Sequence, residues 1–288
     1  MAELVVVAGA TGHLGSAIVH ALRARGLRVR AAGRNRDALQ RFAGLPGVEI
    51  CVADFTHESD ADAAVHGAAM VVSAMGASVS ILRPNDARGL TRSDLQANRT
   101  LIAAAQRAHV AHFLYVSVFH DTATSELAYV RVHRQVEEAL RASNLGAVIV
   151  QPTGFYYALA EMRGAAAYGF LPRFGDGLAR TNPIDEAELA HFCVEALLRG
   201  PGTYPVGGPH VMTRADILRA LLRSVGRAPR LLPVPVWMMR VLAMGLRWVH
   251  PRLGHLLTFF AVVSTHDCVA PPYGQRRFEA YLQQLPKV

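Results

Sequence analysis

The fold of this 288-residue chain is decided by the stretch Leu4-Val5-Val6-Val7-Ala8-Gly9-Ala10-Thr11-Gly12-His13-Leu14-Gly15. Residues 4–8 are an unbroken apolar run that is too short for a helix, and residues 16–25 are compatible with a helix. This order predicts a buried parallel strand that turns into a helix, which is how a dinucleotide site begins. Glycines in the turn would let the backbone approach a pyrophosphate, and the first N–H groups of the helix would face its phosphates.

The spacing of these glycines is G-x-x-G-x-x-G rather than G-x-G-x-x-G, and a glycine triplet alone is also typical of an ordinary turn. We favour a cofactor site because the triplet follows the predicted strand directly. The expected cofactor-binding residues of the loop are Gly9, Thr11, Gly12, His13, Leu14 and Gly15.

The composition predicts a compact globular protein. Hydrophobic residues make up 51% of the chain and charged residues only 18%, so the chain can bury one large core or two unequal lobes. The cysteines Cys51, Cys193 and Cys268 lack C-x-x-C spacing, which predicts neither a metal cluster nor a disulfide framework and fits a reducing compartment. Because no basic segment precedes an apolar one at the N-terminus, we expect no signal peptide and a cytoplasmic protein.

The formal net charge of +8 raises the question of nucleic-acid binding. The basic residues are almost all arginines spread along the chain, and Lys287 is the only lysine. A dispersed arginine excess is more typical of solvated helix faces than of a binding stripe, although basic side chains crowd residues 20–41. We therefore expect no nucleic-acid partner.

The first half of the chain alternates between predicted strands and helices. After the opening strand, strands are predicted at 28–32, 48–53, 70–74, 113–117 and 147–150, with helices at 93–108 and 127–143. Repeated βαβ units specify an α/β fold, a Rossmann-type doubly wound parallel sheet with helices on both faces and ligands at the carboxyl ends of its strands. We expect a dinucleotide-binding core in residues 1–155, with 180–210 returning to it, and a smaller substrate-binding lobe within 156–288.

The residues after the second strand indicate which nicotinamide cofactor fits. An NAD site places an acid there for the ribose 2′-hydroxyl, whereas a 2′-phosphate favours the planar fork of donors of an arginine. This chain has Arg34 and Arg36 there, and no acid before Asp37. The two arginines could also be ordinary members of an arginine-rich chain, but we favour NADPH over NADH and assign Arg34 to the cofactor.

The segment Thr11-Gly12-His13-Leu14-Gly15 resembles the T-G-x-x-G motif of the extended and atypical branches of the short-chain dehydrogenase/reductase superfamily. A second set of residues resembles the NmrA-like branch in its order along the chain: Ser117, His133, Glu137, Leu140, Ser143, Leu145, Pro152, Gly154 and Phe155. The resemblance implies that the ends of the third and fourth strands border the adenine and its ribose. It implies cofactor contacts from Asp54, Phe55, Ala74, Met75 and Gly76, although Asp54 could instead cap the helix that follows.

The same resemblance implies where the chemistry lies. Members of the superfamily end the fifth strand with a serine and carry Tyr-x-x-x-Lys on the next helix, where positions i and i+4 share a face. Ser117 and Tyr129 match this pattern, but His133 stands at the lysine position. Ser117 is expected to hydrogen-bond the substrate oxygen, and Tyr129 is the first candidate proton donor. The competing donor is His120, because histidine titrates near neutral pH without a lysine, and both could also be ordinary surface residues.

Large apolar residues gather after the sixth strand, and the expected substrate contacts among them are Phe155, Tyr156, Tyr157 and Met162. Each is individually more typical of a lobe core, but together they favour a bulky apolar substrate over a small polar one. The function that follows is NADPH-dependent reduction of an aromatic, quinonoid or conjugated carbonyl substrate by hydride transfer from nicotinamide C4. A non-catalytic dinucleotide sensor and a cofactor-retaining epimerase or isomerase are the alternatives, because family resemblance does not fix the reaction.

Residues 237–250 and 253–265, near the C-terminus, are expected to be helical. An apolar stripe at helical spacing runs along the first of these helices: Trp237, Val241, Met244 and Trp248. The stripe could close the substrate lobe, or it could lie on an anionic membrane surface beside a site for a lipophilic substrate. The longest run here without a charged residue or histidine, 256–265, is too short to span a bilayer, and the oligomeric state stays open.

Overall fold

A seven-stranded parallel sheet forms the centre of the protein, of which the computed structural model describes residues 3–76 and 93–286. The strand order is β3-β2-β1-β4-β5-β6-β9. The strands are β1 (Leu4–Ala8), β2 (Arg28–Gly33), β3 (Val48–Val52), β4 (Met70–Ser73), β5 (His112–Val116), β6 (Gly146–Pro152) and β9 (Gly202–Val206). All of their pairings are parallel, which confirms the predicted Rossmann-type, doubly wound sheet.

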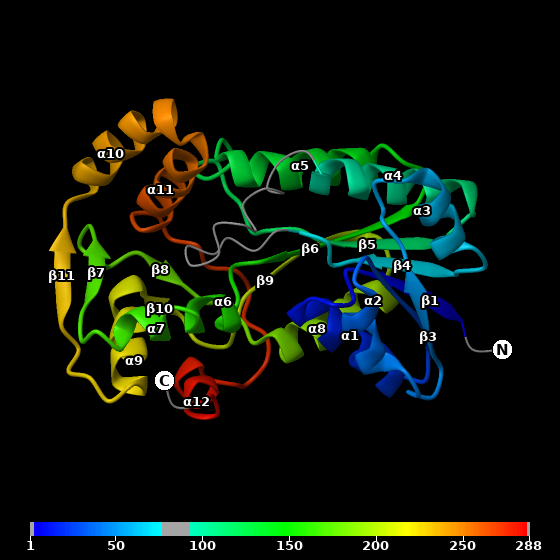
Figure 1. Cartoon of the computed structure of the whole chain (residues 1–288), viewed down its shortest axis with the longest axis horizontal. Coiled ribbons are helices and arrows are strands. Elements are labelled where there is room, and N and C mark those ends of the chain that lie inside the picture. The colour runs from blue at the N-terminus through cyan, green and yellow to red at the C-terminus, as the bar shows by residue number, and fades with distance from the viewer. Residues whose placement is uncertain (1–2, 77–92, 287–288) are drawn as a thin grey trace.

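Helices cover both faces of this sheet (Figure 1). One face is covered by α1 (His13–Ala24) and α8 (Glu186–Arg199). The other face is covered by α3 (Glu58–Val65), α4 (Ser93–Arg107) and α5 (Ala128–Arg141). A short helix α2 (Arg36–Leu39) and a 3₁₀ turn (Gln40–Phe42) follow β2. Because helices cover both faces of the sheet, the apolar run of β1 shows no alternation between apolar and polar residues. Val5 and Val7 pack in the core beside α1, whereas Val6 and Ala8 point to the core on the opposite face. A strand buried on both faces is apolar at every position.

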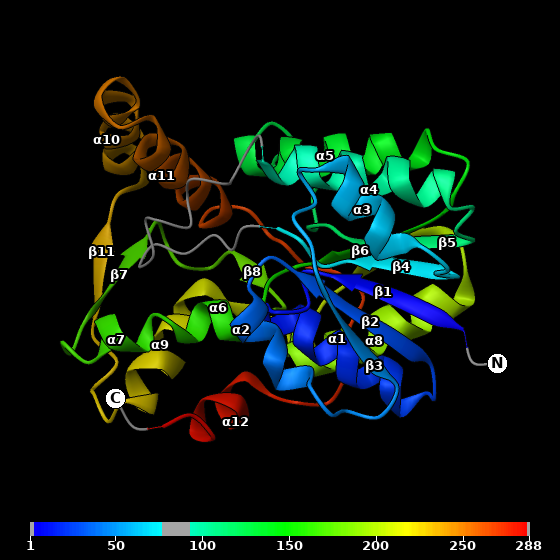
Figure 2. The same cartoon turned by 45° about the vertical axis from the view of Figure 1, so that its right-hand side comes forward.

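The chain leaves the sheet after β6, builds part of a second lobe, returns to the sheet and then completes that lobe (Figure 2). The elements of the second lobe are α6 (Tyr156–Ala160), α7 (Arg163–Ala166), β7 (Leu171–Phe174), β8 (Arg180–Thr181), β10 (Met212–Thr213), α9 (Arg214–Ser224), β11 (Leu231–Val234), α10 (Val236–Val249), α11 (Pro251–Val263) and α12 (Phe278–Gln283). β7 pairs with β11 in parallel, and β8 pairs with β10 antiparallel. Between these elements, α8 and β9 rejoin the main sheet from within residues 180–210.

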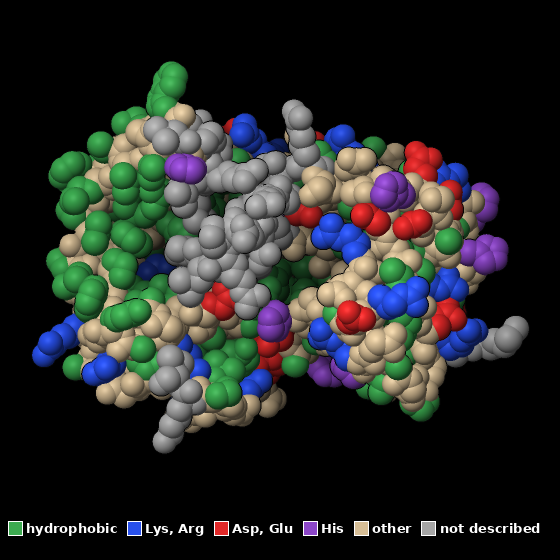
Figure 3. All heavy atoms as spheres, viewed as in Figure 1, with side chains coloured by type: hydrophobic (Ala, Val, Ile, Leu, Met, Phe, Trp, Pro, Cys, Tyr) green, Lys and Arg blue, Asp and Glu red, His purple; other side chains and the backbone are tan. Residues whose placement is uncertain are grey.

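The last long helices of the second lobe, α10 and α11, pack on each other. The predicted apolar stripe of α10 faces outward: Trp237, Val241, Met244 and Trp248 are 65%, 55%, 60% and 92% exposed. Figure 3, in the same view as Figure 1, shows hydrophobic side chains gathered on the left-hand side of the molecule, where α10 lies. A stripe that closed the substrate lobe would be buried, so that interpretation is corrected. Within the described ranges, no helix is both long and apolar enough to cross a membrane.

Candidate active site

The glycine loop lies where the strand order reverses, between β1 and β4, which is the ligand position of doubly wound sheets. Gly9 has a φ of 81°, and a Cβ there would lie 2.9 Å from the carbonyl oxygen of Ala74. A Cβ on Gly15 would collide with the carbonyl group of Gly9. Side chains are therefore excluded from both positions, and α1 can begin close against the loop.

Gly12 is free of such contacts and faces a cavity. A Cβ there would have the Gly9 carbonyl oxygen as its neighbour, at 3.4 Å. Gly12 is also the N-cap of α1, where no side chain caps the helix and no acid occupies the first turn. The first N–H groups of a helix have no acceptor inside it, so those of α1 are open to a ligand. The loop therefore fits a pyrophosphate, which would meet backbone donors and the positive end of the helix dipole.

Arg34 and Asp54 lie together at the ends of β2 and β3. Asp54 accepts hydrogen bonds from the backbone N–H (3.0 Å) and the hydroxyl (2.8 Å) of Thr56. These two bonds, followed by the charges of Arg34 and His57, hold the pKa of Asp54 below its ordinary value although burial opposes them. Asp54 thus stabilises the turn before α3 but does not cap that helix, whose N-cap is His57. Arg34 is exposed and its guanidinium is available to a ligand at this edge.

A cavity of about 420 Å³ runs from the glycine loop into the second lobe. At the loop its wall includes the predicted cofactor contacts Gly12, His13, Leu14, Gly15, Ala74, Met75 and Gly76. Thr11 lies outside this wall, against Gly33 at the end of β2. The side chain of Phe55 is buried in the core, so only its backbone could serve the predicted cofactor contact.

The other end of the cavity is apolar and aromatic, with a lining that includes Phe155, Tyr157, Ala158, Leu159, Met162, Phe259, Phe260 and Val263. The imidazole of His13 stacks on the ring of Tyr157, with centroids 4.6 Å apart, so the glycine loop and the apolar wall touch. Tyr156, an expected substrate contact, requires a correction. It is 1% exposed, packs on Phe278 and donates a 2.9 Å hydrogen bond to the carbonyl of Arg276. Neighbouring residues of a helix point in different directions, and α6 turns Tyr156 into the lobe core.

Ser117 follows β5 directly and lies, buried, in the cavity wall. Its hydroxyl donates a 2.5 Å hydrogen bond to Oε1 of Glu137, a carboxylate that is 1% exposed. The same oxygen accepts a 2.8 Å bond from Gln151 and lies 3.6 Å from Nε2 of His120. Burial acts to raise the pKa of Glu137, but these two hydrogen bonds and the charges of His120 and Arg141 hold it below its ordinary value. The predicted candidates Ser117 and His120 therefore meet at one buried carboxylate.

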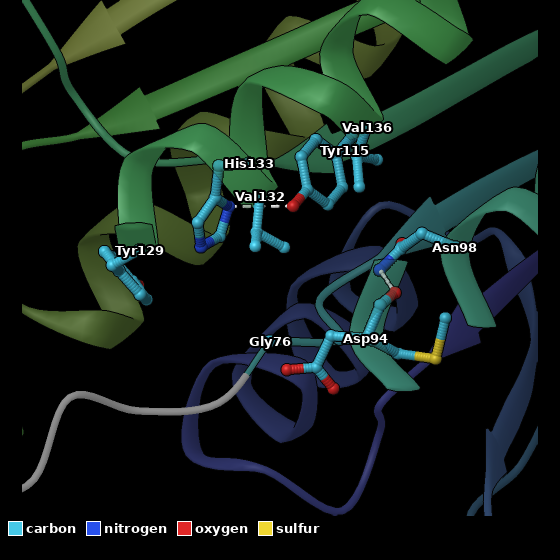
Figure 4. A pocket seen from close by; sticks show the side chains of 9 residues that line it. Gly76, Asp94, Asn98, Tyr115, Tyr129, Val132, His133 and Val136 are labelled. Atoms are coloured by element: carbon cyan, nitrogen blue, oxygen red, sulfur yellow. Dashed lines mark hydrogen bonds between the residues drawn. The ribbon is translucent and has the colours of Figure 1, made fainter. Parts of the chain in front are cut away.

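Tyr129 and His133 share one face of α5, as their spacing predicts, and border a void of about 10 Å³ beside Gly76 (Figure 4). Their rings meet edge to face, with centroids 4.7 Å apart. The hydrogen bond of His133, however, joins its Nδ1 to the hydroxyl of Tyr115 at 2.7 Å. Burial lowers the pKa of His133 to about 4 and raises the pKa of Tyr129. At neutral pH His133 is thus uncharged and does not replace the ammonium of a lysine; Lys287 lies outside the described residues.

Several residues of the site were not predicted. Glu137 belongs to the NmrA-like order of residues, but that order implies no role for it; it lies four residues after His133 on the apolar face of α5. Gln151 lies at the end of β6, where a polar side chain in an apolar strand was the available signal. Phe259 and Arg214 come from α11 and α9, far from the loop in sequence. No local pattern distinguishes such residues from ordinary core or surface positions.

Comparison with known proteins gives the family of the chain. A family model described as NAD(P)H-binding matches residues 9–199. A divinyl chlorophyllide a 8-vinyl-reductase from Oryza sativa is 30% identical over 98% of this chain and 78% of its own length. An NAD(P)H azoreductase from Xenophilus azovorans is 27% identical over 79% of this chain and 76% of its own. An NADPH-dependent quinone oxidoreductase from Escherichia coli, 18% identical, shares the fold with a TM-score of 0.74 over 97% of this chain and 98% of its own. The chain therefore belongs to the NAD(P)H-binding family that this model describes.

Proposed function

We propose that the protein is an NADPH-dependent reductase of a bulky, apolar substrate with an aromatic, quinonoid or conjugated carbonyl system. The observation that carries this proposal is that one cavity joins the glycine loop to an aromatic wall, with His13 stacked on Tyr157 between them. A flat apolar molecule against that wall would lie beside a dinucleotide held by the loop. The names of two relatives, a vinyl reductase of a chlorophyllide and an azoreductase, also describe reduction of large conjugated molecules.

The choice of NADPH rests on Arg34. It is exposed directly after β2, where a ribose 2′-phosphate would lie, and its fork of donors suits that group. When bound, the cofactor would supply a hydride from its nicotinamide ring. The chain itself would bind the pyrophosphate at Gly12 and orient the ring against the cavity wall.

The chain would also supply the proton that reduction requires. Tyr129 lines the cavity, and burial keeps the proton on its hydroxyl, so we propose it as the donor. Ser117 would hydrogen-bond the substrate oxygen by turning its single O–H from Glu137 to the substrate. His120 is the competing donor. It lies behind Ser117, in the hydrogen-bonding network of Glu137, and a proton from it would have to pass through that network.

The proposal is tested by following NADPH absorbance with quinones, azo dyes and enones as substrates. We expect oxidation of NADPH that requires the added substrate and saturates with its concentration. The variant Gly12→Val is the control, because a side chain in the pyrophosphate position should abolish the reaction. Tight binding of NADPH without its oxidation by any member of the panel would contradict a reductase.

One observation favours a second function, a non-catalytic dinucleotide sensor. The neutral, buried His133 stands where the superfamily carries lysine, so position 133 gives Tyr129 no positive charge that would help it release a proton. A sensor would bind NADPH through the same loop and Arg34. It would leave the absorbance of NADPH unchanged in the assay above, and binding would instead alter its contacts with a protein partner.

A further inference from the structure

Arg214 brings a positive charge into the wall of the cavity, at its largely apolar end. It is the first residue of α9, whose N-terminus is fixed by a capping box between Thr213 and Asp216. Its backbone N–H donates a 2.9 Å hydrogen bond to the carbonyl of Ala179. The backbone of Arg214 is therefore held rigidly, and its side chain lies beside α11 in the cavity wall.

The guanidinium of Arg214 has one hydrogen-bond partner in the described ranges, the carbonyl oxygen of Val263, which accepts from Nε at 3.1 Å. The carboxylate of Asp267 is near but is bound to Arg180, at 2.7 Å from its backbone nitrogen and 2.8 Å from its Nε. Glu161 also lines the cavity and is itself engaged in an interaction. The remaining N–H groups of this guanidinium therefore have no acceptor among the described residues.

Arg141 and Arg276, unlike Arg214, each form an ion pair with a buried carboxylate. Arg141 lies 3.0 Å from Glu137, and Arg276 lies 2.5 Å from Asp185. Burial lowers the pKa of Arg214, but an arginine in a protein stays protonated. A desolvated charge without a hydrogen-bonded counterion costs free energy, which a ligand anion bound to it would offset.

We propose that Arg214 binds a carboxylate of the substrate, which makes the substrate a bulky aromatic or conjugated carboxylic acid; this rests on the function proposed above. The planar guanidinium can donate to both oxygens of a carboxylate. The aromatic wall holds the ring system, and Arg214 fixes which end of it faces the glycine loop. A neutral analogue of the same shape leaves the guanidinium unpaired and binds more weakly.

Arg214 also has a structural role, which the test must separate from ligand binding. Its bond to Val263 ties α9 to the last turn of α11, where a positive charge faces the C-terminal end of the helix. That bond uses Nε alone. The variant Arg214→Gln separates the two roles, because a glutamine amide can still donate to the Val263 carbonyl but carries no charge.

The experiment measures binding of azobenzene-4-carboxylate and of the neutral azobenzene-4-carboxamide by calorimetry, on the full chain with and without NADP⁺. We expect the wild type to bind the carboxylate about tenfold or more tightly than the carboxamide, and Arg214→Gln to bind the two equally with its carboxamide affinity unchanged. Arg214→Lys should keep part of the preference. The matched control Arg219→Gln, one turn later on α9 where Arg219 pairs with Asp216 at 3.1 Å, should keep all of it.

Equal affinities in the wild type, or a preference for the carboxylate that survives in Arg214→Gln, would overturn the Arg214 site and leave the reductase proposal standing. Binding of neither azobenzene would overturn the Arg214 site and count against an aromatic substrate as well. Thermal unfolding of each variant shows whether the fold is kept. The wild-type comparison of the two azobenzenes needs no variant, so it decides the proposal even where Arg214→Gln unfolds.

Discussion

Ser117 and Glu137 are joined by a 2.5 Å hydrogen bond although they lie on different elements, at the end of β5 and in the middle of α5. The bond fixes α5 against the carboxyl end of the sheet. With His120 at 3.6 Å from the same carboxylate, the cavity wall is connected to a buried acid whose lowered pKa favours the ionised form. Kinetics of variants of the two candidate donors, Tyr129 and His120, can therefore decide which residue supplies the proton.

Removal of the Tyr129 hydroxyl should reduce turnover strongly. We expect Tyr129→Phe to lose about 10²-fold or more in kcat with NADPH affinity kept, because a general acid acts only in the reaction step. The measurement is single-turnover oxidation of NADPH under conditions where hydride transfer limits the rate. Full activity of Tyr129→Phe together with loss in His120→Ala would assign the donor to the histidine. Full activity of both variants would show that neither residue is the donor.

Arg34 should select NADPH over NADH. We expect Arg34→Ala to weaken NADPH binding about tenfold or more and to leave NADH binding unchanged, because only NADPH carries the 2′-phosphate. Arg36→Ala, at the start of α2, is the matched control and should have the smaller effect. Both dissociation constants are measured by titration of the nicotinamide fluorescence. A wild type that binds the two cofactors equally would remove the basis for the assignment.

Gly12→Val should abolish cofactor binding in a folded protein. The φ of Gly12 is −75°, and a Cβ there meets no atom closer than 3.4 Å, so the fold can accept a side chain that would occupy the pyrophosphate position. Gly15→Val is the contrasting variant and should unfold the protein, because its Cβ would collide with Gly9. Circular dichroism and NADPH titration check both variants. Unchanged NADPH affinity in folded Gly12→Val would show that the loop serves another purpose.

Acid should destabilise the protein through His133. Burial lowers its pKa from 6.5 to about 4, so the unfolded chain binds more protons than the folded chain between these values. Stability should therefore fall as the pH falls from about 6.5 to about 4, by on the order of 3 kcal/mol from this residue. Urea unfolding at a series of pH values measures the slope, which should be shallower in His133→Gln and unchanged in the control His191→Gln on exposed α8 surface. Equal slopes in all three proteins would refute the prediction.

Because the apolar stripe of α10 is exposed, we predict that it binds the surface of an anionic membrane. Trp237 and Trp248 are the only tryptophans of the chain, so tryptophan emission excited at wavelengths that tyrosine does not absorb reports on this stripe alone. No Asp or Glu occurs between Asp216 and Asp267, while arginines recur there, so repulsion between like charges would oppose pairing of two copies and anionic lipid would favour binding. We expect vesicles containing phosphatidylglycerol to shift the emission to the blue, and high salt to reverse the shift.

Two variants test that prediction further. Val241→Glu should abolish the shift while leaving both tryptophans in place, and Leu198→Glu, at another exposed apolar residue on α8, should leave the shift intact. A blue shift that depends on protein concentration without vesicles would indicate self-association instead. An emission spectrum that no vesicle changes would refute membrane binding.

The sheet could be predicted because its first six strands are short, mostly apolar segments that end at or near glycine or polar residues, and their observed bounds differ from the expected ones by at most two residues. The small sheets of the second lobe could not. β7 and β11 contain Pro172 and Pro233, and pairings this short form only where the tertiary structure brings the segments together.

The candidate site was predictable where a motif fixes backbone geometry and unpredictable where partners meet across the fold. Gly12 and His13 follow from the loop, and they line the cavity. The aromatic run after β6 indicated a wall but not which rings face the cavity: Tyr157 lines the cavity, whereas Tyr156 is buried in the lobe core. Arg214 carries no sequence signal in a chain with so many arginines, because its role depends on which acids the fold brings near it and on their being bound elsewhere, as Asp267 is to Arg180.

The late return of β9 to the sheet has a consequence for synthesis. β6 ends at Pro152, and the strand that pairs with its outer edge, Gly202–Val206, leaves the ribosome only after α6, α7, β7, β8 and α8 have been made. During that interval the nascent chain presents an unpaired strand edge with apolar side chains. Translation of residues 153–201 is therefore a long period in which a growing chain is open to pairing with a neighbour, and a slow ribosome there would favour aggregation over folding.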